Sequence, residues 1–287
     1  MVQEQVVSIK SRAELASVEG IKSQKKNSMG RAWADILDGG RLYWLWTRLA
    51  YHDIKMRYRG SVIGPFWLTL STAIMATMLG TLYAKLFHVD IQDFLPYVTI
   101  GLIVWQFISS AINEACMTFV AVSSEIRQVC LPFSSHVFRL VYRNLLVLAH
   151  NIVILPVVLV IFPPKVGMET LMLFPALLIL TLNAVWLACL LGLLGARFRD
   201  LPQIVANVLQ VLIFMTPIFW RPEALGEYQF LAYYNPLYAA VDILRAPMFG
   251  AWPDSTSWPM MLGVTAFGCG LTFALFTRFR GRIAYWV

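Results

Sequence analysis

Residues 66–85 read FWLTLSTAIMATMLGTLYAK, an apolar run whose only charge is Lys85. An α-helix rises about 1.5 Å per residue, so a run of this length crosses the roughly 30 Å hydrocarbon core of a bilayer. The preceding residues 52–65, HDIKMRYRGSVIGP, are basic and finish with Gly64-Pro65, which is expected to end one helix before the next begins. This stretch therefore predicts a membrane span that is preceded by a basic helix.

The composition of the whole chain is that of a membrane protein. Of 287 residues, 59% are hydrophobic and 14% are charged, whereas a typical soluble domain is about half apolar and a quarter charged. The net charge of +7 fits contact with anionic lipid headgroups. The basic residues lie next to apolar segments and do not form a stripe in which basic and aromatic residues are interleaved, so nucleic acid is not expected as a partner. The cysteines lack metal-type spacing, and we expect free thiols that pack as small hydrophobes.

Six apolar runs are long enough to be spans. They cover residues 66–86, 94–122, 144–162, 171–195, 203–219 and 258–277. The sequence therefore predicts an all-α membrane protein, with a six-span transmembrane domain at 65–287 and an amphipathic interfacial helix region at 31–64. Residues 1–30 are polar, and their apolar residues show no helical or strand periodicity, so we expect a disordered cytoplasmic tail there.

The distribution of Lys and Arg sets the orientation. If the N-terminus is cytoplasmic, every basic residue falls on the inner side except Lys85, Lys165, Arg221 and Arg245. The positive-inside rule therefore predicts a multi-pass protein with both termini in the cytoplasm.

Residues 41–59 predict an amphipathic helix that lies in the membrane interface. Trp67 follows where interfacial aromatics are common. Helical spacing places Leu42, Leu45, Trp46, Leu49 and Met56 on one side, and Arg41, Arg48, His52, Lys55 and Arg59 on the other. From the residues alone, this helix is either an anchor that sets topology or a basic face that receives a substrate.

The run RYRGSVIGPFW at 57–67, followed by six spans, resembles the permease subunits of type-2 ABC exporters for cell-surface polysaccharides, which include O-antigen, capsule and teichoic-acid exporters. Their pattern is close to Arg-x-Arg-Tyr-(Arg/Lys)-x-Ser-x-Leu-Gly-x-x-Trp. Ile63 replaces the usual Leu, and Lys55 stands where the first Arg is common. Matching positions are Arg57, Tyr58, Arg59, Ser61, Gly64 and Trp67. The resemblance covers about residues 40–287 and extends to EIRQVCLPFSSHVFR at 125–139 and YYNPLYAAVDILR at 233–245.

This resemblance implies a complex in the bacterial inner membrane. It implies a homodimer, which the small size of one six-helix unit also favours, bound to two copies of a separate ATPase subunit that holds ATP and Mg²⁺. The substrate would be a lipid-pyrophosphate-linked polysaccharide, most simply an O-antigen chain. Capsule polysaccharide or another exported substrate is the alternative. The basic residues Lys55, Arg57 and Arg59 would receive the anionic lipid head.

The loop at 123–137 is a plain connection or, as the resemblance implies, a short helix that couples to the ATPase. In the second case Glu125 and Arg127 would make rim contacts, while Val129 and Leu131 would supply an apolar centre.

The segment 221–257 predicts two short outer helices before the last span. Asn235 suits an N-cap and Pro236 the first helical position of a helix that reaches Gly250 and includes Arg245. These helices form an extracellular cap or, as the resemblance implies, an outer gate.

Glu114 is the one acid well inside a span, where a carboxylate must face protein or water. It either pairs with a neighbour such as Arg143 or Asn144, or takes part in substrate uptake. Aromatic residues, 14% of the chain, could stack on sugar rings, although Trp and Tyr also form interfacial belts. The candidates for a channel wall are Trp67, Tyr83, Tyr97, Trp105, Phe107, Phe214, Phe219 and Trp220.

Several chemistries are missing from the sequence. It contains no Walker A loop, HExxH motif or CxxC motif, so we expect no ATPase site, metal or cofactor in this chain. Other function classes are less well supported. A secondary transporter would usually show inverted repeats, and a membrane-embedded transferase would need a cluster of acids, histidines or metal ligands.

Overall fold

The computed structural model describes residues 28–61, 64, 66–161 and 167–287, and this part of the chain is helical without strands. The expected tail at 1–30 therefore lies almost wholly outside the described residues. The N-terminal half contains α2 (Ser28–Arg41), α3 (Tyr43–Arg57), α4 (Phe66–Leu86), α5 (Ile91–Ala115), α6 (Ser123–Gln128), α7 (Phe133–Ile152) and α8 (Ile154–Ile161). The C-terminal half contains η1 (Met168–Met172), α9 (Leu173–Arg197), α10 (Leu201–Met215), η2 (Pro222–Tyr228), α11 (Gln229–Tyr233), α12 (Pro236–Met248), α13 (Ser257–Phe279), η3 (Arg280–Arg282) and α14 (Ile283–Trp286).

Within the described residues, five helical segments are long and apolar enough to cross a membrane, which confirms the all-α, multi-pass class. They are Phe66–Leu86, Ile91–Ala115, Phe133–Val158, Met168–Arg197 and Ser257–Trp286.

The sixth expected span is shorter than the sequence predicted. The apolar run at 203–219 becomes α10, a helix of 15 residues that ends where Thr216 turns to an extended backbone just before Pro217. Thr216 and the three residues after it are buried. At about 1.5 Å per residue, α10 measures only about 22 Å, because the last part of the apolar run folds back against the bundle.

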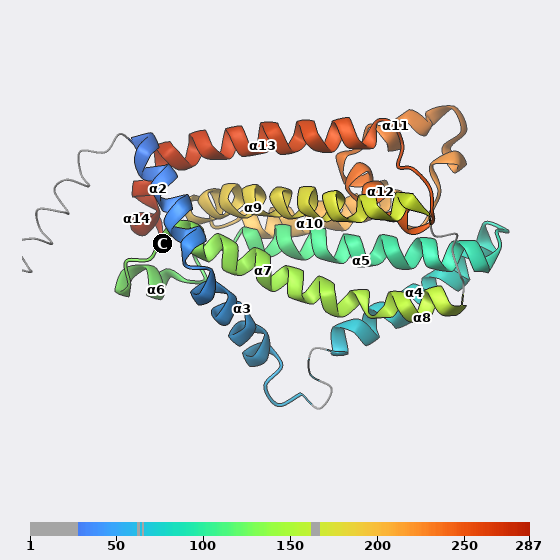
Figure 1. Cartoon of the computed structure of the whole chain (residues 1–287), viewed down its shortest axis with the longest axis horizontal. Helices are drawn as coiled ribbons and strands as arrows, with labels where there is room; N and C mark the ends of the chain where they lie inside the picture. The colour runs from blue at the N-terminus through green and yellow to red at the C-terminus, as the bar shows by residue number, and fades with distance from the viewer. Residues whose placement is uncertain (1–27, 62–63, 65, 162–166) are drawn as a thin grey trace, which may run out of the picture.

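Figure 1 shows a bundle of long helices with different elements at its two ends. One end holds α2, α6, α14 and the C-terminus, and the other holds α11 and α12. Helix α5 lies at the centre and packs against α4, α7 and α9. Its inward side chains, including Ile103, Val104 and Phe107, form a core with Leu193 of α9 and Val241 of α12.

The expected interfacial helix is two helices with a break at Leu42. Trp46 of α3 packs on the rings of Phe138 and Tyr142 of α7, and its indole N–H donates to the Gly39 carbonyl oxygen at 3.1 Å. Leu42, Leu45, Trp46 and Leu49 of the expected apolar side are half-buried, and Met56 is exposed. Aromatic rings exposed on α3 belong instead to Tyr43, Trp44 and Tyr51.

Candidate functional site

Six charged side chains from four helices form an ion-pair cluster at the end of the bundle that holds α6. Arg139 of α7 is its centre, with Nη2 2.6 Å from Asp53 Oδ1 of α3 and Nη1 2.9 Å from Glu125 Oε2 of α6. Arg143, one turn along α7, lies 3.0 Å from Asp53 Oδ2 and 2.8 Å from Glu114 Oε2 of α5. The members of the ion-pair cluster are Asp53, Arg57, Glu114, Glu125, Arg139 and Arg143, and they line a cavity of about 530 Å³.

Glu114 has both of the neighbours that the sequence suggested. Its Oε2 accepts from Arg143 and, at 2.9 Å, from Asn144 Nδ2. Its other oxygen, Oε1, accepts from Arg57 Nη2 of α3 at 2.7 Å. These partners compensate the carboxylate near the end of a span, and they make Glu114 the link between α3, α5 and α7.

The three basic residues considered for substrate reception are therefore not equivalent. The guanidinium of Arg57 is held by Glu114. Lys55 and Arg59 are exposed, and within the described residues neither makes an ion pair. Of these three residues, Lys55 and Arg59 are the two whose positive charge is not used in an ion pair within the described part of the chain.

Asp53 makes the ion-pair cluster sensitive to acid. Burial alone would raise the pKa of its carboxyl, but hydrogen bonds and charges from Arg139 and Arg143 outweigh burial and hold the pKa below its ordinary value. A carboxyl with a lowered folded-state pKa stabilises the fold above its unfolded-state pKa, about 3.9, and that contribution is lost as the pH falls through the folded-state value.

We expect Asp53→Asn to lower the melting temperature at pH 7 and to narrow the difference in melting temperature between pH 7 and pH 3. The reason is that the amide keeps the shape of Asp53 but carries no charge at either pH. Thermal unfolding of both proteins in detergent at the two pH values measures this. An undiminished pH difference in the variant would contradict the assigned role of Asp53.

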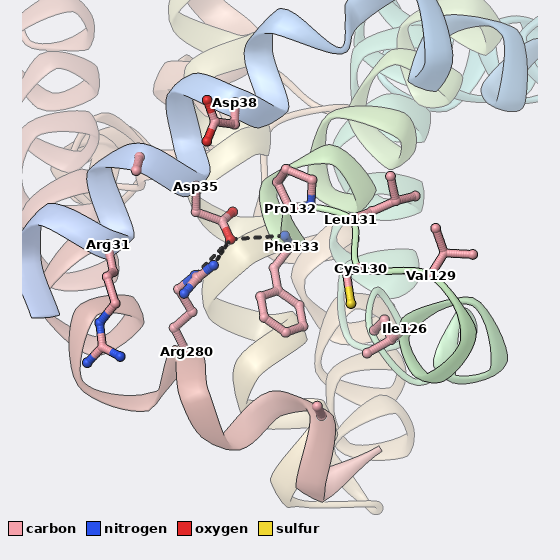
Figure 2. Close-up of a pocket in the computed structure, with 12 residues that line it drawn as sticks. Arg31, Asp35, Asp38, Ile126, Val129, Cys130, Leu131, Pro132, Phe133 and Arg280 are labelled. Atoms are coloured by element: carbon pink, nitrogen blue, oxygen red, sulfur yellow. Dashed lines mark hydrogen bonds and ion pairs between the residues drawn. The ribbon is translucent and has the colours of Figure 1, made fainter. Parts of the chain in front are cut away.

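A groove of about 480 Å³ is lined by residues of α2, of α6 and the segment after it, and by Arg280 (Figure 2). On one side Asp35 of α2 is buried and accepts from the backbone N–H groups of Phe133 and Ser134 at 3.2 and 2.9 Å, which caps the start of α7. The same carboxylate pairs with Arg280 at 2.7 Å. The opposite side of the groove is apolar and comes from α6 and the residues after it, including Ile126, Val129 and Leu131.

The segment expected to couple to an ATPase does contain a short helix, α6, but its two charged residues are used within the chain. Glu125 binds Arg139, and Arg127 Nη2 donates to the carbonyl oxygen of Val287. Val129 is exposed, and Leu131 is half-buried at the rim of the groove. The exposed residues of this segment are Ser124, Arg127, Gln128, Val129 and Cys130, so an outside partner would meet both polar and apolar side chains.

The channel-wall candidates divide by exposure. Trp105, Phe107 and Phe219 are buried in the core of this chain. Tyr83 is half-buried and stacks on Phe87 and Phe219. The rings of Trp67 and Phe214 are exposed, and Trp220 is half-buried.

Tyr97 lies beneath Arg245 of α12, whose guanidinium is 3.8 Å from the centre of the ring. Arg245 is 3% exposed, and its Nη1 donates to the Pro217 carbonyl oxygen at 2.8 Å. Gly101 leaves the room that this side chain occupies, since a Cβ there would lie 2.3 Å from Nη2. Arg245 thus fastens α12 to α5 and to the chain after α10.

The start of α12 confirms the expected cap. Asn235 Oδ1 accepts from Leu237 N at 2.9 Å, and Pro236 is the first helical residue. The amide of Asn235 also lies 3.4 Å from Thr216 Oγ1.

We expect Asn235→Ala to destabilise the protein by about 1 kcal/mol, the usual cost of losing an N-cap, while Asn235→Asp costs less because a carboxylate can also cap. Thermal unfolding in detergent compares the three proteins. Equal stability of the alanine variant and the unchanged protein would show that the cap contributes nothing here.

Sequence reasoning missed Asp35, Asp53 and Arg139. An acid placed among basic residues on α3 was the available signal for Asp53, since an amphipathic helix facing anionic lipid has no other use for it. Asp35 and Arg139 gave no comparable signal, because their partners are 98 and 86 residues away along the chain.

Comparison with known proteins gives one family and a consistent set of relatives. Residues 45–249 match the family described as ABC-2 type transporter. The chain is 22% identical over 217 residues to the O-antigen export system permease protein RfbA of Klebsiella pneumoniae, covering 75% of this chain and 81% of that protein. It is 25% identical over 175 residues to the protein of the same name from Myxococcus xanthus, covering 60% and 66%.

Proposed function

Because the chain belongs to the ABC-2 type transporter family, we propose that it is the transmembrane subunit of an ATP-driven exporter that carries a lipid-linked polysaccharide across the bacterial inner membrane. The names of its relatives favour an O-antigen chain as the substrate. ATP would be bound and hydrolysed by a separate ATPase subunit, and two copies of each subunit would form the complex with both permease termini in the cytoplasm.

The ion-pair cluster is the observation that carries this proposal. Through Arg139 it connects α6, the segment that would contact the ATPase, to α3 and α7, and through Arg143 and Glu114 it continues to α5. A displacement of α6 on ATP binding would therefore move the helix that precedes the first span together with two spans. This arrangement also disfavours ion-coupled transport, because Glu114 is already bound to two arginines.

Lys55 and Arg59 would be the residues that receive the substrate. A lipid pyrophosphate is an anion at the membrane surface, and an exposed positive charge next to the first span attracts it. Arg59 can hold a phosphate with two parallel hydrogen bonds, which a lysine cannot. Arg57 would contribute mainly by holding α3 against Glu114.

A deletion strain tests the proposal as a whole. Loss of surface polysaccharide with accumulation of lipid-linked glycan in the cytoplasm, restored by the cloned gene, is the expected result. Normal surface polysaccharide in the deletion strain would refute export of this substrate. Co-purification of the tagged permease from the native membrane, with mass spectrometry of the bound proteins, tests the partnership with an ATPase.

We expect Lys55→Gln with Arg59→Gln to lower surface polysaccharide severalfold at an unchanged melting temperature and membrane level. Arg57→Gln should lower both export and the melting temperature, because Glu114 loses a partner. Arg41→Gln with Arg48→Gln removes equal charge from the preceding turns and serves as the control. If this control variant lost as much export as the first pair, total charge and not position would explain the effect.

A further inference from the structure

A line of neutral amide side chains runs along an exposed face of α10. Gln203, Asn207 and Gln210 follow one another at intervals of four and three residues, which places them on one side of a helix. All three are exposed, as is Phe214, which continues the line toward the outer end. We refer to Gln203, Asn207 and Gln210 as the amide line. Residues 201–215 contain no charged side chain.

The amide line is unsuited to contact with lipid. Hydroxyl groups on α4 satisfy themselves within their own helix, since Thr77 and Thr81 each donate to a carbonyl oxygen four residues back at 2.8 Å. Asn183 of α9 does the same with the Ile179 carbonyl oxygen at 2.8 Å, whereas no such bond to the backbone is found for the amide line among the described residues. Within the described residues their one mutual contact is a long one, 3.5 Å from Gln203 Nε2 to Asn207 Oδ1. Unsatisfied amides in hydrocarbon cost several kcal/mol each, so this face must meet polar groups.

The packing of α10 shows which face is already covered. Leu209 is buried in a cluster with Leu102 and Trp105 of α5, and Val205 and Leu212 pack against the same cluster. Gln106, the residue after Trp105, is a further exposed amide on α5. Both helices therefore bury their apolar sides against each other and leave amide groups outside the contact.

We infer that the amide line binds the hydroxyl groups of the saccharide chain during its passage; this inference rests on the proposed function. An amide offers donors and an acceptor side by side, as a sugar hydroxyl does. Being neutral, it binds without a charge that would have to be desolvated at each step. Three equivalent groups in a row allow one sugar unit to exchange its hydrogen bonds for those of the next. Phe214 adds an exposed ring on which a sugar can stack at the outer end.

The first test removes hydrogen bonding without removing volume. The variant Gln203→Met, Asn207→Leu, Gln210→Met is made in the full-length chain and expressed in the deletion strain with its native partners. The matched control changes the neighbouring exposed stripe of α10, as Ile204→Met, Val208→Leu, Val211→Met. We expect surface polysaccharide, measured by periodate staining, to fall about tenfold in the first variant, as several hydrogen bonds are lost at once, and to stay normal in the control. Asn207→Gln, which keeps an amide, should retain most export.

The second test identifies what touches the amide line. A photoreactive phenylalanine is placed at Asn207, and at the exposed Phe267 of α13 as a control, and membranes are irradiated during export. We expect an adduct between the permease and the periodate-stained glycan at Asn207 and none at Phe267. An adduct at Asn207 only with a second permease copy would overturn the inference, because the amides would then pair two helices.

The two tests separate this inference from the proposed function. Normal export by the triple amide variant would overturn the amide line as a saccharide surface, yet leave the exporter proposal intact as long as the deletion strain lacks surface polysaccharide. Normal surface polysaccharide in the deletion strain would instead overturn the exporter proposal itself.

Discussion

Arg139→Met is expected to lower surface polysaccharide at least tenfold and to destabilise the protein by about 3 kcal/mol. The reason is that removing one partner of a buried ion pair leaves the other charges buried without their counter-charge. Arg139 is 13% exposed and binds Asp53 with two nitrogens at 2.6 and 2.8 Å while a third holds Glu125. Methionine fills similar space without charge. The variant therefore separates α6 from α3 and leaves Asp53 with Arg143 alone. Surface polysaccharide and detergent melting temperature are the two measurements.

Two further variants show whether geometry or charge is responsible. Arg139→Lys keeps the charge but cannot reach Asp53 and Glu125 together, so we expect intermediate export. Arg41→Met is the matched control, because Arg41 pairs with Asp38 across 3.4 Å but both side chains are more than half exposed. Exposed pairs contribute little. Export and stability that remained normal in Arg139→Met would show that α6 moves independently of α3.

The all-helical membrane architecture followed from the sequence because hydrophobic length and charge asymmetry are local properties. Five of the six apolar runs became helices that can span a bilayer. The run at 203–219 did not, because hydropathy does not register that Pro217 and the residues around it fold against α12 through Arg245 and Asn235. A tertiary contact thus overrode a local pattern.

Part of the candidate site could be predicted from the sequence for the same reason. Glu114 could be identified because a carboxylate in a span needs a partner, and its expected neighbours Arg143 and Asn144 lie on the next span at similar depth. Arg139 could not, since an arginine is unremarkable in a basic segment until the helices meet, and Asp53 carried only the signal of an acid among basic residues. The burial of Trp105 and Phe107 could not be predicted either, because the sequence of a span does not show whether an aromatic ring faces a conduit or the core.

Gly195→Ala is expected to prevent stable folding. A Cβ at this position of α9 would lie 1.8 Å from the carbonyl oxygen of Cys116 and 2.9 Å from its carbon, at the turn that follows α5. Cys116 is fully buried, and the obstacle is backbone that no side-chain rotation can remove. Overpacking a core costs about 1–3 kcal/mol where side chains can adjust, so the cost here should exceed that range.

Gly263→Ala on α13 is the same chemical change without the contact, because nothing lies within 4 Å of its Cβ position. Alanine is the better helix former by about 1 kcal/mol, so this variant should match or exceed the stability of the unchanged protein. Size-exclusion profiles and melting temperatures in detergent compare the two variants. A well-folded Gly195→Ala protein would mean that α9 can withdraw from the turn after α5. A Cβ at Gly192, one turn earlier on α9, would lie 3.0 Å from Thr118 Cβ and 3.1 Å from the Phe119 ring, so α9 is close to the same turn there too. Such a shift would therefore have to move a whole turn of α9, which is why we expect loss of the fold.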